Sequence, residues 1–173
     1  MKFDVKKKVM LAVLAGNMLC MGSVCAEDIY WYGTTSGFVN EKPSPAVTTG
    51  VNLTVTDDYK VHGDDVTEPN GIYGGYTDGS DTISGNILTF NLSNTIEVGA
   101  GIYGGYTGGS GNANSNKVTI NSGTFNSVFG GQSDSGNANS NIIMFNGGTV
   151  AEAICGGFTD NGNANSNSIT AYI

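Results

Sequence analysis

Three copies of one polar heptapeptide decide the fold of this chain. They read "SGNANSN" at residues 110–116 and at 135–141, and "NGNANSN" at 161–167. Catalytic loops rarely recur at nearly constant spacing, whereas the corner of a repeating coil must do so. A flexible polar linker is the alternative, but a linker has no reason to stay in register with the sequence around it. We therefore interpret the heptapeptide as a structural corner.

A glycine pair recurs in step with the heptapeptide. The copies are GIYGGYTDGS (71–80), GIYGGYTGGS (101–110), SVFGGQSDSG (127–136) and AICGGFTDNG (153–162). Their first apolar residues are spaced by 30, 26 and 26 residues; these are Ile72, Ile102, Val128 and Ile154. A fixed period of this size is typical of a solenoid.

Short runs of alternating apolar and polar residues follow each corner. They lie at 86–91, 116–121 and 141–146, and a further run begins at 168. Period-two alternation predicts strands, and no stretch of residues 27–173 has a helical period. We therefore predict an all-β fold, a parallel β-helix (β-solenoid) of about four to five coils of strands roughly 4.8 Å apart, with an irregular N-terminal cap.

Stacked coils align equivalent residues in ladders. Parallel stacking places Val118 near Phe90, and Ile120 over Phe145. The corner asparagines are expected to hydrogen-bond their side-chain amides from coil to coil. Glycine and asparagine are also the residues that best accept positive φ, so we expect them at the sharpest points of each corner.

The glycine pair is predicted to form a bend or bulge. In this interpretation the flanking aromatic residues cover neighbouring coils. A phosphate-binding loop is excluded because no lysine follows the glycines and no helix pattern follows the strand.

The N-terminal segment has the pattern of a secretory signal peptide. Residues 1–8 carry four lysines against one aspartate, and an apolar run at 9–21 leads to Ala26. This pattern predicts export and cleavage after Ala26, so 1–26 form the signal peptide. Residues 27–70 are expected to form the cap and a degenerate first coil. Residues 71–173 form the repeats, which we expect to be truncated at the C-terminus, because the last alternating run stops early.

Charge and cysteine content exclude several classes of partner and site. Residues 27–173 contain three lysines, no arginine and fourteen acidic residues. Nucleic acid and anionic lipid are therefore not expected partners, since both require clustered basic side chains. Cys155 is the single cysteine in this range, so neither an internal disulfide nor a cysteine-based zinc site is predicted. We expect Cys155 to be a small buried hydrophobe.

A cluster of acidic residues lies at 57–68, close to the only histidine, His62. It consists of Asp57, Asp58, Asp64, Asp65 and Glu68. Calcium prefers such oxygen ligands, but no calcium-loop spacing is present, so a solvated acidic loop is the preferred interpretation. A carbohydrate-active β-helix enzyme using these carboxylates is the alternative. No catalytic, cofactor-binding or metal-ligating residue is predicted.

Three aromatic residues are candidates for stacking on sugars. They are Tyr76, Tyr106 and Phe158, which follow the glycine pairs. A carbohydrate-binding module would use them in this way. Packing between coils is the preferred interpretation.

The repeat pattern "IYGGYT…GNANSNKVTINSGTF…VFGG" resembles the passenger repeats of bacterial autotransporter and haemagglutinin-like adhesin proteins over residues 71–173. The resemblance implies a right-handed parallel β-helix at the cell surface, carried by a downstream outer-membrane barrel. No catalytic motif of the family matches this sequence, so no catalytic residue is carried over.

Together these features predict an exported structural or adhesin-type passenger segment that is not an enzyme and needs no cofactor. It is expected at the cell surface, at the outer membrane or outside the cell, with no membrane span of its own after signal cleavage. The expected partners are a glycan or protein of a host or neighbouring cell. Edge-to-edge self-association is a further expectation.

Overall fold

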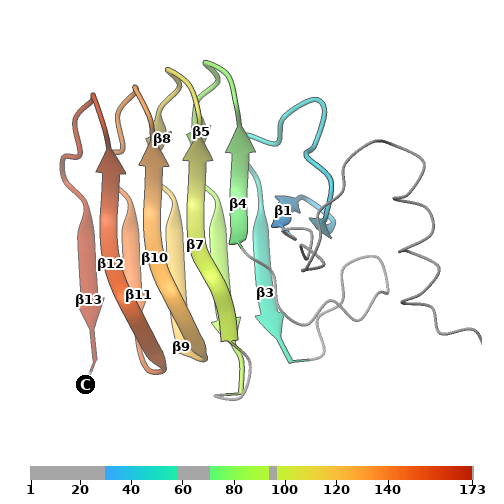
Figure 1. Ribbon diagram of the computed structural model, residues 1–173, viewed down its shortest axis with the longest axis vertical. Coiled ribbons are helices and arrows are strands. Elements are labelled where there is room, and N and C mark those ends of the chain that lie inside the picture. The colour runs from blue at the N-terminus through green and yellow to red at the C-terminus, as the bar shows by residue number, and fades with distance from the viewer. Residues whose placement is uncertain (1–29, 58–70, 94–96, 173) are drawn as a thin grey trace, which may run out of the picture.

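The strands of this protein stack into a parallel β-solenoid of about three turns (Figure 1). The computed structural model describes residues 30–57, 71–93 and 97–172. These residues contain strands and connecting segments and no helix, so the predicted all-β solenoid class is confirmed. The predicted four to five coils and the cap at 27–70 are not confirmed. The predicted signal peptide lies outside the described residues.

Two main sheets form the walls of the solenoid (Figure 1). The first has the order β12-β10-β7-β4-β1-β2, with β1 (Tyr30–Thr34), β2 (Gly37–Val39), β4 (Gly71–Thr77), β7 (Glu97–Thr107), β10 (Thr124–Ser133) and β12 (Thr149–Thr159). The second has the order β13-β11-β9-β6-β3, with β3 (Asn52–Thr56), β6 (Ile87–Asn91), β9 (Lys117–Ser122), β11 (Ile142–Phe145) and β13 (Ser168–Ala171). Two short corner strands, β5 (Ile83–Ser84) and β8 (Ala113–Asn114), pair with each other.

All of these pairings are parallel except the antiparallel pair β1–β2. Parallel neighbours in one sheet are the geometry that a stack of similar coils must produce, because every coil runs in the same direction. The chain therefore pairs each strand with its equivalent one repeat away.

Apolar ladders fill the space between the two walls. Ile120 pairs with Phe145, as predicted, and Val118 pairs with Leu88, two residues before Phe90. Side chains at these inward positions are fully buried in the middle coils; Leu88, Phe90, Val118, Ile120 and Ile143 all have 0% exposure. Each such side chain stabilises the fold by about 1.5–3 kcal/mol relative to an exposed position.

A ladder of buried asparagines runs along the corner. The Asn116 side-chain oxygen accepts hydrogen bonds from both the backbone N–H and the side-chain amide of Asn86, each at 3.1 Å. Asn141 accepts the same two bonds from Asn116, at 2.9 and 3.2 Å, and Asn167 accepts them from Asn141. The predicted coil-to-coil amide bonding is confirmed at this position. Each carboxamide thus satisfies a buried backbone donor of the preceding coil.

The residue with positive φ in the NANSN corner is the serine. Ser115, Ser140 and Ser166 have φ of 56°, 58° and 57°. Our expectation that asparagine or glycine takes this conformation is wrong for these three copies, although Gly85, with φ 68°, occupies the equivalent point of the first corner. The asparagines on either side bond to neighbouring coils, so the exposed serine between them makes the turn.

The glycine pairs lie within strands and do not form bends. Gly130, in β10, does not have positive φ, so the predicted corner role of the pair is wrong. Glycine is required at these two positions because a side chain would not fit. A Cβ at Gly130 would lie 2.3 Å from the Gly156 carbonyl oxygen, and one at Gly131 would lie 2.5 Å from Nδ2 of Asn141. The absence of a side chain at Gly130 therefore lets the backbone of the next coil approach closely. The absence of a side chain at Gly131 leaves room for the Asn141 amide of the ladder.

Alanine at Gly130 is expected to destabilise the protein by more than about 2 kcal/mol, because the backbone of the next coil cannot move away without breaking its strand pairing. The matched control is Gly79→Ala, where the nearest atom to the added Cβ is 3.5 Å away. Denaturant unfolding of both variants measures the difference. Equal stability of the two would contradict the close-approach explanation.

The asparagine ladder gives a second stability prediction. In Asn116→Ala the backbone N–H of Asn86 loses its buried acceptor, and we expect a loss of about 2–3 kcal/mol. Asn121 makes a similar side-chain contact, 2.7 Å to Asn91, but on the exposed surface. Asn121→Ala is therefore expected to cost less than about 1 kcal/mol in the same denaturation experiment. A reversed order would show that the buried ladder is not a main source of stability.

Candidate functional site

Stacked aromatic rings form a column on the outer side of the first sheet. Tyr32, Tyr73, Tyr103 and Phe129 occupy equivalent positions of successive coils. Their ring centroids are 5.3, 4.9 and 5.1 Å apart, with interplanar angles of 10°, 14° and 4°. The next position in the column is Cys155, which has no ring. Each ring therefore covers the faces of its neighbours, and the column ends at Phe129.

A second aromatic column stands beside the first. Tyr76 and Tyr106 stack at 5.5 Å and 13°, and the equivalent positions of the next two coils are Gln132 and Phe158. The two columns meet edge to face, for example Tyr73 on Tyr76 at 5.1 Å and 71°. The prediction that these aromatics pack between coils is confirmed for Tyr76 and Tyr106.

This packing restricts the sugar-stacking candidates. Tyr76 is buried, and one face of its ring lies on Tyr106 while Lys42 lies over the ring. Tyr106 is half-buried in the same stack. Phe158 is 41% exposed and is the candidate of the three whose ring is most open to solvent. A ligand can therefore reach the exposed part of the Phe158 ring without displacing a stacked neighbour.

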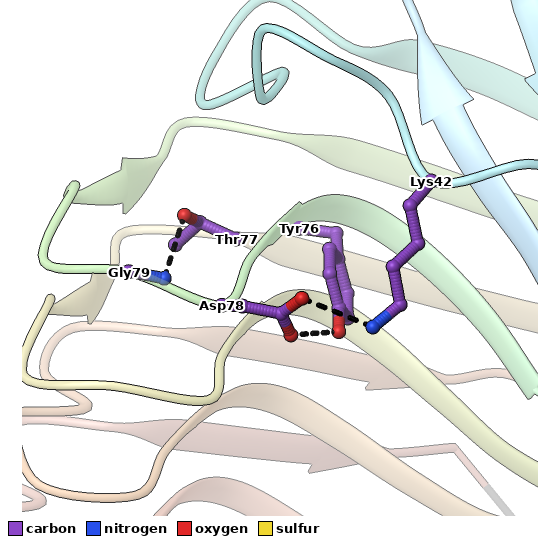
Figure 2. Close-up of polar contacts among 5 residues, drawn as sticks. All are labelled: Lys42, Tyr76, Thr77, Asp78 and Gly79. Atoms are coloured by element: carbon purple, nitrogen blue, oxygen red, sulfur yellow. Dashed lines mark hydrogen bonds and ion pairs between the residues drawn. The ribbon is translucent and has the colours of Figure 1, made fainter.

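One cluster of charged and polar groups adjoins the aromatic columns. Lys42 Nζ lies 3.0 Å from Oδ2 of Asp78 and 5.1 Å from the centroid of the Tyr76 ring, and the Tyr76 hydroxyl donates to Oδ1 of Asp78 (Figure 2). Asp78 begins the turn after β4, where the Gly79 N–H donates to Thr77 Oγ1 at 3.1 Å. The cluster thereby ties the segment between β2 and β3 to the corner of the next coil.

The lysine and aspartate side chains of this cluster are more than half exposed, at 56% and 63%. A solvent-exposed ion pair of this kind contributes at most about 1 kcal/mol. Lys42 also borders a shallow, open depression lined by Thr34 and residues 39–45. The arrangement offers a cation, a carboxylate and a phenol that donates its proton to that carboxylate.

The environment shifts the pKa of several groups here. Burial, followed by the hydrogen bond to Asp78, raises the pKa of Tyr76 to about 12. The hydrogen bonds from Tyr76 and Lys42 lower the pKa of Asp78 and keep it ionised. Burial also raises the pKa of Tyr73 and Tyr103 in the first column. These phenols therefore stay protonated at neutral pH, and act as hydrogen-bond donors or ring surfaces.

The structure describes one member of the acidic group at 57–68. Asp57, just after β3, accepts a hydrogen bond of 2.6 Å from the backbone N–H of Ser93. Asp58, His62, Asp64, Asp65 and Glu68 lie outside the described residues. Within the described residues, no group of three or more histidine, cysteine, aspartate or glutamate side chains could hold a metal ion. The calcium interpretation and the carboxylate-enzyme alternative thus stay untested.

Cys155 is free and only half-buried, whereas the sequence predicts a buried position. The reason is its place on the outer aromatic column, where the earlier coils have Tyr103 and Phe129. Sequence reasoning also missed the Lys42 cluster. Lys42 and Asp78 are far apart in sequence, and only the Tyr-x-Asp spacing of Tyr76 and Asp78 was a local signal.

No protein-family model, curated protein or solved structure matches this chain. The part of the chain that the structure describes has no helix both long enough and apolar enough to cross a membrane.

The half-buried phenols of the first column predict a loss of stability in alkali. Because the pKa of Tyr103 is raised on folding, the unfolded chain releases its phenolic proton at a lower pH than the native protein does. The stabilisation is complete below about pH 10, the pKa of an unfolded tyrosine, and is lost as the pH rises through the folded value. Melting temperatures between neutral pH and pH 12 should therefore fall steeply above about pH 10.

Tyr103→Phe is expected to reduce that fall, since phenylalanine already fills the next position of the column at Phe129. The control is Tyr172→Phe, at a side chain that is 63% exposed. A pH dependence that neither variant changes would show that the column does not cause the alkaline instability.

Proposed function

We propose that this chain is an exported, surface-exposed or secreted structural segment of adhesin type, similar to the passenger of a bacterial autotransporter, and that it is not an enzyme. The observation that carries the proposal is the use of recurring polar and aromatic side chains in coil-to-coil contacts. Asparagines bond to asparagines and rings stack on rings along the solenoid. Such a chain builds a spacer whose outer surface presents side chains for recognition.

Two features of the sequence support export and surface exposure: the N-terminal segment and the acidic composition of the remainder. The signal-like residues 1–26 direct the chain across the inner membrane. The acidic charge of the remainder, with three lysines and no arginine, suits a solvated surface and disfavours nucleic acid as a partner. We place the protein at the cell surface, at the outer membrane or outside the cell.

We also propose that residues 27–70 cap the N-terminal end of the solenoid. The support is β2, a strand of three residues that pairs antiparallel with β1 and lies at the end of its sheet. A short strand of opposite direction is a common way to stop edge-to-edge pairing. Trp31, Phe38 and Val55, at this end, are all less than 5% exposed.

The partner is a glycan or protein on a host or neighbouring cell. Beads coated with the purified protein should adhere to cells or to arrayed glycans, whereas a panel of acidic and neutral polysaccharides should not be cleaved. Appreciable cleavage that is lost in Asp64→Asn or Asp65→Asn would contradict the proposal and support a carbohydrate-active enzyme.

The same bead assay distinguishes a glycan partner from a protein partner, because a glycan partner gives binding to the arrayed glycans and a protein partner gives binding to cells alone. If arrayed glycans are bound, Phe158→Ala is expected to weaken binding at least about fivefold, by analogy with the stacking of a nucleic acid base on an aromatic side chain, which contributes about 1–3 kcal/mol. Ile142→Ala removes an apolar side chain of similar exposure, 40%, from the outer face of the second sheet and serves as the matched control. Equal loss in both variants would exclude sugar stacking at Phe158.

A further inference from the structure

The second sheet differs in charge from the rest of the protein (Figure 1). Its strands, β3, β6, β9, β11 and β13, contain no aspartate or glutamate, and Lys117 is their single charged residue. Residues 71–173 as a whole carry six acidic side chains and no lysine or arginine besides Lys117. This sheet therefore presents a local positive charge on a chain whose formal net charge is −8.

Strand pairing places Lys117 between two exposed isoleucines. Lys117, in β9, pairs with Ile87 of β6 and with Ile142 of β11. The residue that follows each of these three in the sequence is fully buried, so the three side chains lie on the outer face of the sheet. Ile87 and Ile142 are 36% and 40% exposed. The Lys117 ammonium has no ion-pair partner among the described residues, whereas Lys42 is paired with Asp78.

Uncharged side chains surround this centre. Thr89, Thr119 and Met144 form the next outward ladder. Beside it, a row of exposed asparagines is linked by side-chain hydrogen bonds of 2.7 Å, from Asn121 to Asn91 and from Asn146 to Asn121. An apolar centre with a polar rim is the usual anatomy of a protein–protein interface, in which methionine is enriched. The centre offers aliphatic side chains and no aromatic ring on which a sugar could stack.

We propose that the outer face of β6, β9 and β11 binds an acidic segment of a partner protein, in which a carboxylate flanked by apolar side chains lies on Lys117, Ile87 and Ile142. Charge complementarity selects the carboxylate, because a lysine that a partner covers loses its water and needs an anionic partner. Burial of the two isoleucines selects the apolar neighbours of that carboxylate. The inference rests on the proposed adhesin-type function for where the partner is found, but not for what the face binds.

A second copy of this chain fits the face less well. Two copies that meet face to face about a two-fold axis through β9 bring their Lys117 ammonium groups together without a carboxylate between them, and such like-charge contacts are unfavourable. The acidic corner residues Asp78, Asp134 and Asp160 have only threonine, serine, glycine and asparagine as sequence neighbours. A corner of another copy thus supplies a carboxylate without the apolar side chains that the isoleucines need.

Fluorescence anisotropy with labelled synthetic peptides tests the proposal in solution. The probe is a peptide of alternating leucine and glutamate, and its matched control has glutamine in place of glutamate. The wild-type protein is expected to bind the glutamate peptide with a Kd below about 1 mM, and at least about tenfold more tightly than the glutamine peptide. Lys117→Gln is expected to remove this preference, and Lys117→Arg is expected to retain it.

Two further variants separate the charge from the apolar contact. Lys42→Gln removes the other lysine that the structure describes, and is expected to leave the binding of both peptides unchanged. Ile142→Ser is expected to weaken the binding of both peptides, since both contain leucine. Circular dichroism checks that each variant keeps the β-structure of the wild-type protein.

Absence of binding, equal binding of the two peptides, or a preference that Lys117→Gln retains would each overturn the proposal. Self-association that Ile142→Ser abolishes in analytical ultracentrifugation would assign the face to a second copy, and would overturn it as well. The peptide titration uses no cells, so its failure does not affect the adhesin-type function, which the bead assay tests. Likewise, a failure of bead adhesion does not change the result of the titration.

Discussion

The structure depends on one contact, the buried carboxamide of an asparagine that bonds to the backbone of the coil before it. Asn116 and Asn141 are both 0% exposed, and each accepts the backbone N–H of the equivalent asparagine in the preceding coil. Each also donates its amide to a carbonyl of the preceding corner, Ile83 or Ala113. A corner of this shape leaves backbone groups that strand pairing cannot satisfy. The asparagine satisfies them without water, which explains its recurrence at positions 86, 116, 141 and 167; in the first described coil Val51 takes this position and donates its backbone N–H to Asn86.

The other repeated features follow from the register that this contact imposes. Once each asparagine lies over the next, the paired strand positions of one coil lie over the equivalent positions of its neighbour, apart from local register shifts. Identical aromatic residues then stack, as in the pair Tyr73 and Tyr103. The close approach at the glycine pair has the same origin, since the Asn141 amide occupies the space that a side chain at Gly131 would need. The exceptions to strict repetition, such as Cys155 in the aromatic column, lie on the outer surface, where mismatch costs less.

The sequence predicts the coil and its ladders because both depend on periodicity alone. Alternation fixes which side of each strand is apolar, and the spacing of the repeats fixes which strand lies beside it, as the pairing of Ile120 with Phe145 shows. Periodicity carries no information on which corner residue takes positive φ. The choice of Ser115 follows from the hydrogen bonds of the asparagines beside it, and these bonds exist only in the folded stack. The contact between Lys42 and Asp78 joins a non-repeating segment to a repeat, so no pattern could reveal it.

The unequal spacing of the repeats indicates which insertions, deletions and duplications in the gene the fold can tolerate. Ile72 and Ile102 are 30 residues apart, whereas Ile102 and Val128 are 26 apart, yet the three residues pair in one uninterrupted ladder. The connection from β6 to β7 is longer than the one from β9 to β10, and a register shift beside Phe125 adjusts the pairing within the strands, so both absorb such differences. Small insertions and deletions between ladder positions are therefore tolerable. Duplication or loss of a whole repeat changes the length of the rod by one strand spacing, about 4.8 Å, and leaves every remaining contact as it was. Unequal recombination between repeats can thus set the reach of such a protein without redesigning its fold.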